Sequence, residues 1–97
     1  MSVIIDFSIF PMDKGVSLSP YVARAIKIVK GCGLPYRFGP MSTCIEGEWD
    51  EVMAVVNQCF EELKADCGRI LINLKADYRE GPGGRMQGKI KSVESKL

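Results

Sequence analysis

The residues most suited to chemistry lie in one short segment, residues 40–47, where hydroxyl, thiol and carboxyl side chains follow one another. Thr43 and Glu46 in this segment place a hydroxyl and a carboxylate at the end of a predicted strand, just before a predicted helix. We expect Glu46 to lie near Asp6 and Ser8, which alternate with apolar residues early in the chain. A structural interpretation is the alternative, in which Thr43 is a β-forming residue and Glu46 is a solvated strand end.

Catalytic groups of the usual kind are scarce. The chain has no histidine, the commonest general acid or base and the usual activator of a cysteine nucleophile. Its four cysteines show no C-x-x-C spacing, so we expect free thiols and no metal site. We therefore predict a protein that binds a small molecule and is not an enzyme, with no cofactor.

Length and composition limit the class of protein. Ninety-seven residues suit one domain, 1–97, and 46% hydrophobic with 26% charged residues is an ordinary globular balance. A formal net charge of +1 argues against nucleic acid as a partner. No apolar run is long enough to span a membrane, and no basic segment precedes the first apolar residues, so we expect a cytoplasmic protein.

Two alternating segments and two helical stripes predict the elements. Residues 70, 72, 74, 76 and 78 of the last strand are expected to face inward with the odd positions of the first. Ser19 is expected to cap the first helix, with Pro20 in its first turn. A glycine-rich linker at 80–85 should precede a short C-terminal helix. The predicted strands span 3–10, 36–38, 42–46 and 69–79, and the predicted helices span 20–31, 48–66 and 86–96.

The order β-α-β-β-α-β predicts an α+β, ferredoxin-like sandwich, a four-stranded antiparallel sheet with two helices on one face. The other face should then mix apolar and charged side chains. Such a surface indicates a subunit contact or a ligand site. The residues expected on it are Ile4, Asp6, Ser8, Phe10, Leu71, Asn73, Lys75 and Asp77.

Two further functions stay open from the residues alone. One is a small enzyme on this fold, either an isomerase or an acyl-phosphate hydrolase. The hydrolase pattern places an arginine after a glycine-rich loop that follows the first strand, and Lys14-Gly15-Val16 with Arg24 matches it only loosely because the loop holds one glycine. The other is a structural or regulatory module whose open face only joins subunits. Turnover of an acyl phosphate would favour the first, and failure of every vitamin to raise the melting temperature would favour the second.

Several short motifs, taken together, resemble the small thiamine-binding protein family of the YkoF-like group. They cover nearly the whole chain in the family's order. They are Ser8-Ile9-Phe10-Pro11, Ser17-x-Ser19-x-Tyr21-Val22-Ala23, Gly33-Leu34-Pro35-Tyr36, Met41-Ser42-Thr43-x-x-Glu46-Gly47, Arg69-Ile70 and Lys75-Ala76-Asp77-Tyr78-Arg79.

The resemblance implies a ferredoxin-like fold, a homo-oligomer built as a dimer of dimers, and binding of thiamine or its hydroxymethylpyrimidine moiety without catalysis. An aminopyrimidine pairs well with carboxyl and hydroxyl groups, and a cationic thiazolium favours carboxylates and aromatic faces. The roles that this implies are a pyrimidine contact for Glu46, hydrogen bonds from Ser8 and Thr43, stacking by Tyr36 or Phe10, and charge compensation by Asp6.

Overall fold

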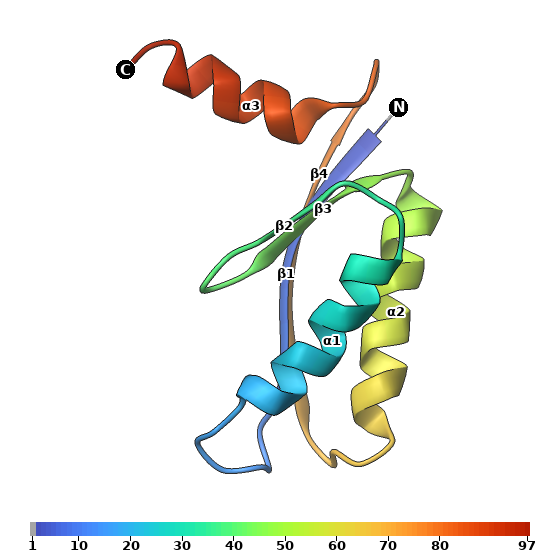
Figure 1. Cartoon of the computed structure of the whole chain (residues 1–97). Helices are drawn as coiled ribbons and strands as arrows, with labels where there is room; N and C mark the ends of the chain where they lie inside the picture. The colour runs from blue at the N-terminus through green and yellow to red at the C-terminus, as the bar shows by residue number, and fades with distance from the viewer. Residues whose placement is uncertain (1) are drawn as a thin grey trace.

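The computed structural model describes residues 2–97 and confirms the predicted order of elements (Figure 1). The observed boundaries lie within two residues of the predicted ones. They are β1 (Ser2–Pro11), α1 (Ser19–Gly31), β2 (Tyr36–Phe38), β3 (Thr43–Gly47), α2 (Trp49–Lys64), β4 (Ile70–Arg79) and α3 (Arg85–Glu94).

The four strands form one antiparallel sheet in the order β2-β3-β1-β4, which confirms the ferredoxin-like fold. Ile5 pairs with Ile45 of β3 on one side and with Ala76 of β4 on the other. Because directly opposed residues share a face, this register fixes the face of each side chain in the sheet. Helices α1 and α2 lie side by side on one face, and α3 extends to the other side at the end where β1 begins (Figure 1).

The hydrophobic core lies between the sheet and these two helices. The odd positions of β1 are buried as predicted, with Ile5 completely covered. Val29 of α1 and Leu63 of α2 are also fully buried against it. Each such aliphatic side chain stabilises the fold by roughly 1.5–3 kcal/mol relative to an exposed one. Helix α3 buries none of its residues, so the core does not depend on it.

The prediction that the even residues of β4 face the core holds for Ile70, which is partly buried against it, and is wrong from Ile72 onward. The register places them on the helix side, yet Ile72 and Leu74 are 37% and 38% exposed and Tyr78 is 57% exposed. The reason is that β4 is an edge strand, while the helices pack mainly over β1 and β3. Both faces of β4 therefore present apolar side chains at the surface.

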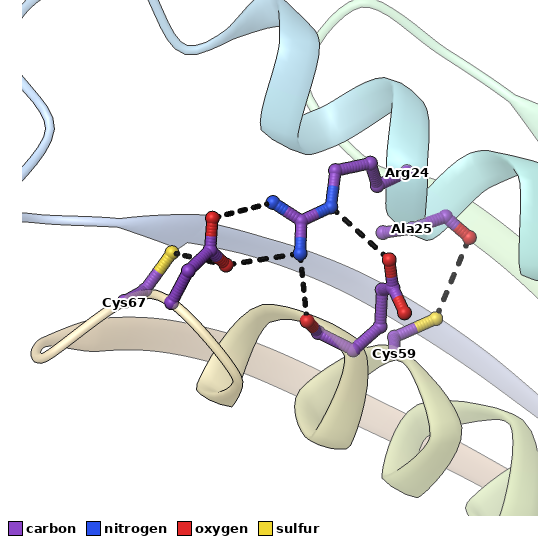
Figure 2. Close-up of polar contacts among 6 residues, drawn as sticks. Arg24, Ala25, Cys59 and Cys67 are labelled. Atoms are coloured by element: carbon purple, nitrogen blue, oxygen red, sulfur yellow. Dashed lines mark hydrogen bonds and ion pairs between the residues drawn. The ribbon is translucent and has the colours of Figure 1, made fainter.

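Arg24 holds the two helices of the core layer together (Figure 2). Its guanidinium donates to Glu62 Oε1 at 3.1 Å, to both carboxylate oxygens of Asp66 at 2.9 and 3.0 Å, and to the Glu62 main-chain oxygen. Hydrogen bonds from Arg24 lower the pKa of the Asp66 carboxyl. Arg24, which the alternative of an acyl-phosphate hydrolase would need as an anion ligand, is therefore engaged in joining α1 to α2.

The two core helices begin differently. Ser19 is the first residue of α1 and does not cap it; the preceding Leu18 has the capping position and makes no side-chain cap, which corrects the sequence prediction. Pro20 lies in the first turn as predicted. In α2 the Glu51 side chain accepts a hydrogen bond from the Glu48 amide at 3.0 Å, which fixes the start of that helix. Within residues 2–97, no helix is both long and apolar enough to cross a bilayer.

Candidate functional site

Thr43 and Glu46 lie on opposite faces of the sheet, although the sequence prediction grouped them in one site. Thr43 pairs with Phe7 and shares its helix-side face, whereas Glu46 pairs with Ile4 on the open face. Their separation of three residues gives opposite directions in a strand, because side chains alternate with a period of two. Both are buried, Thr43 under the helices and Glu46 under the start of α3.

Glu46 already has two partners. Its Oε2 accepts a hydrogen bond from the Arg85 amide at 2.8 Å, and its Oε1 accepts one from the Met86 amide at 3.2 Å. These are amides of the first turn of α3, which have no acceptor within the helix and attract a negative charge. Glu46 is therefore positioned to anchor α3 across the open face.

Asp77 supports the same anchor from β4. Its Oδ2 lies 2.9 Å from Nη2 of Arg85 and 3.1 Å from Nζ of Lys89. Lys89, followed by Arg85, lowers the pKa of the Asp77 carboxyl. Arg85 also donates to the main-chain oxygen of Ser2 at 3.2 Å, so the C-terminal helix is tied to both central strands. Arg85 and Lys89, two basic residues of α3, are thus engaged within the chain.

A cavity of about 230 Å³ lies at the opposite end of β1, between the first half of α1 and the β2–β3 turn. Its walls are mainly apolar, and the polar residues among them are Ser8, Ser42 and Thr43. The lining residues are Phe7, Ser8, Ile9, Phe10, Leu18, Val22, Ala25, Ile26, Phe38, Gly39, Pro40, Met41, Ser42 and Thr43.

The cavity exists because β3 is shorter than β1. The ladder between them ends at the pair Phe7–Thr43, while β1 continues through Pro11 in contact with β4 alone. Residues 8–10 consequently have no partner strand on the cavity side within the described chain, residues 2–97. A strand edge of this kind offers amide and carbonyl groups to any flat molecule that carries a matching donor and acceptor.

Three of the six predicted ligand contacts border the cavity, and the other three lie in three different places. Ser8, Phe10 and Thr43 border the cavity. Asp6 lies on the open face, where its Oδ1 accepts a weak hydrogen bond from the Cys44 thiol at 3.5 Å. Tyr36 pairs with Ile45 at the outer edge of the sheet and does not line the cavity. Glu46 lies under α3.

Sequence reasoning assigned most of the residues that form this cavity to no site, and Val22, Phe38 and Ser42 are examples. Val22 was assigned only to the apolar stripe of α1, and Phe38 only to a short strand. Ser42 was placed in the polar segment without a role. The alternation of side chains across the predicted hairpin could have found Phe38. Phe38 lies opposite Thr43, so the two side chains lie on the same face of the sheet.

An open-face groove lies on the other side of the sheet. Asp6 and Ser8 of β1 line it, together with Asn73 and Lys75 of β4. The groove continues toward α3, where Cys44 and Lys89 border it. It is charged and shallow, unlike the apolar cavity.

The thiols are poor nucleophiles in these positions. Burial raises the pKa of Cys59 to about 11, and burial followed by the Asp6 carboxylate raises the pKa of Cys44. Burial also raises the pKa of Cys67, which lies beside Asp66 (Figure 2). A thiol needs a lowered pKa to react readily at neutral pH, so the environments of these three cysteines oppose nucleophilic chemistry. Across residues 2–97, no three thiol or carboxyl groups gather in a way that could hold a metal ion.

Comparison with known proteins identifies the family to which this chain belongs. A family model described as "Thiamine-binding protein" matches residues 5–94. A UPF0045 protein of Mycobacterium tuberculosis is 39% identical over 98 residues, which cover 100% of this chain and 96% of that protein. The UPF0045 protein YqgV of Bacillus subtilis is 32% identical, with 97% and 96% covered.

Solved structures agree with this relationship. A protein of Methanocaldococcus jannaschii superposes with a TM-score of 0.88 at 30% identity, covering 96% of each chain. A Thermotoga maritima protein, described as a candidate thiamine biosynthesis/salvage protein, superposes with a TM-score of 0.79 at 25% identity. That superposition covers 94% of this chain and 99% of the other.

Proposed function

We propose, since this chain belongs to the thiamine-binding protein family, that it binds thiamine or its hydroxymethylpyrimidine moiety in the cavity beside α1. The observation that carries the proposal is the convergence of three separate motifs on that cavity. Residues 8–11 supply the strand edge, residues 17–23 supply Val22 of the helix wall, and residues 41–47 supply part of the turn and Thr43.

The chemistry of the cavity suits an aminopyrimidine. Apolar side chains can enclose the flat ring and its methyl group, and this burial supplies most of the affinity in such sites. The ring nitrogen and exocyclic amine present an acceptor next to a donor, which matches the unpartnered edge of β1 at residues 8–10. Ser42 and Thr43 add hydroxyls on the opposite wall. A volume of 230 Å³, below the roughly 300–1,000 Å³ of sites for larger ligands, fits one ring.

The proposal includes binding without turnover. Histidine is absent from the sequence, and the pKa values of Cys44, Cys59 and Cys67 are raised. The cavity itself is lined by no carboxylate, lysine or arginine among residues 2–97, so it offers no general acid or base of ordinary strength. A bound ligand would therefore be released from this site without chemical change.

We propose a homo-oligomer, a dimer of dimers, as the working form in the cytoplasm, with residues 1–97 as one domain. Its support is β4, a ten-residue edge strand with apolar side chains exposed on both faces. Such an edge is a ready template for pairing with another chain. Light scattering should give four times the monomer mass, and Leu74→Lys should reduce it. A wild-type monomer would contradict the proposal.

Isothermal titration calorimetry with thiamine and with hydroxymethylpyrimidine tests the site. Val22→Trp should abolish binding because the indole fills the cavity. Thr43→Val keeps the shape and removes one hydroxyl, and should weaken binding by roughly five- to tenfold if that hydroxyl contacts the ligand. Lys91→Ala, on the exposed side of α3, is the matched control and should bind as the wild type does. Circular dichroism melting checks that each variant folds.

Asp6→Asn distinguishes the two faces of the sheet. Asp6 lies in the open-face groove and not at the cavity, so this variant should bind thiamine as the wild type does. Loss of binding in Asp6→Asn with binding kept in Val22→Trp would move the ligand to the open face. Absence of binding to the wild type would refute the function itself.

A further inference from the structure

The cavity opens outward into a second, shallower groove on the surface of α1. Five side chains line both compartments and make them continuous: Leu18, Val22, Ile26, Phe38 and Pro40. Val16, which is fully exposed in the loop before α1, borders the outer groove but not the cavity. If a ligand ring occupies the cavity, a second group attached to that ring can therefore lie on the apolar surface of the groove.

Phe38 lies at the junction of the two compartments. It pairs with Thr43, so its side chain projects from β2 toward α1. Although it lines both compartments, its side chain is 58% exposed, which leaves an aromatic surface uncovered beside the cavity. A large aromatic residue left open next to an apolar pocket is typical of a recognition surface.

Neither compartment carries a formal charge. Among residues 2–97, the side chains that line the cavity and the groove include no lysine, arginine, aspartate or glutamate. Nothing there would neutralise a phosphate group, which is normally recognised by arginine, lysine or a cluster of amides. A cationic heteroaromatic ring, by contrast, is stabilised by the face of an aromatic side chain without any carboxylate.

We infer that the outer groove holds the second, cationic ring of the ligand against Phe38, so the full site selects a two-ring molecule over the pyrimidine alone and gains no affinity from a phosphate group. The inference rests on the proposed function and names which of its ligands the chain prefers. The pyrimidine occupies the cavity, the thiazolium lies over Phe38 in the groove, and the hydroxyethyl group points to solvent.

Calorimetric titration of thiamine, hydroxymethylpyrimidine and thiamine monophosphate into three proteins tests this assignment. The wild type should bind thiamine more tightly than hydroxymethylpyrimidine and should bind the monophosphate no more tightly than thiamine. Phe38→Leu should weaken thiamine by about fivefold, the upper end for an exposed cation–π contact, and leave hydroxymethylpyrimidine unchanged. Tyr36→Leu, which changes an exposed aromatic residue on the same strand outside both compartments, is the control.

The outcomes separate this inference from the proposed function. If the wild type binds none of the three compounds, the function fails. Equal affinities for thiamine and hydroxymethylpyrimidine, or equal losses for both compounds in Phe38→Leu, would overturn the two-ring site and leave the function intact. Tighter binding of the monophosphate would also overturn it, because a phosphate-binding group would then have to lie at the groove.

Discussion

Replacing Glu46 with glutamine should loosen α3 from the sheet without unfolding the core. The carboxylate of Glu46 accepts hydrogen bonds from the amides of Arg85 and Met86, at 2.8 and 3.2 Å, and is only 4% exposed. A glutamine side chain retains one carbonyl oxygen and turns an NH₂ donor toward the other amide. One of the two contacts is therefore lost, together with the negative charge at the helix start.

The magnitude follows from these contacts. A hydrogen bond to a charged group contributes roughly 1.5–3 kcal/mol and a neutral one roughly 0.5–1.5 kcal/mol, so the exchange should cost about 1–2 kcal/mol of docking free energy. A loss of about 1.4 kcal/mol raises the undocked population of α3 about tenfold. The ion pairs of Asp77 with Arg85 and Lys89 are kept in this variant, so α3 should still populate the docked state.

Amide hydrogen exchange measured by NMR gives the test. The amides of Arg85 and Met86 should exchange about tenfold faster in Glu46→Gln, because they donate directly to the altered side chain. The amide of Ile5, in the core of the sheet, should keep its protection. Glu94→Gln, at an exposed position of the same helix, is the control. Unchanged exchange at Arg85 and Met86 in Glu46→Gln would refute the reasoning.

Two other predictions concern stability. Because hydrogen bonds from Arg24 lower the pKa of Asp66 in the folded state, this pair stabilises the fold above the carboxyl's unfolded pKa of about 3.9 and ceases to do so as the pH falls through the lower folded value. Urea titrations at a series of pH values should show that Asp66→Asn loses stability at neutral pH and converges with the wild type in acid; a constant difference would contradict the pair's role. Leu63→Ala should lower the free energy of unfolding by about 2–5 kcal/mol because Leu63 is fully buried, and Leu97→Ala at the exposed C-terminus should change it little. Similar urea midpoints for these two variants would show that Leu63 is not part of the core.

The fold could be read from the sequence because its signals are local. Alternation in residues 3–10 and the helical stripe after Ser19-Pro20 each report the environment of neighbouring positions, and the element order restricts the topology. The same alternation in β4 gave a wrong prediction of burial after Ile70. It shows which residues share a face of the sheet but not whether a helix covers that face. Coverage depends on the width of the helix layer, which is a tertiary property.

The amino-acid sequence by itself determined the strand and helix order, the faces of β1, the scarcity of catalytic groups and the motifs of a thiamine-binding family. The tertiary structure alone decided that Glu46 binds the start of α3, a helix 39 residues further along the chain. It also decided that the cavity lies where β3 ends before β1, with Phe38 and Val22 in its walls. These features arise from the relative lengths and packing of elements that are distant in sequence, so no local pattern encodes them.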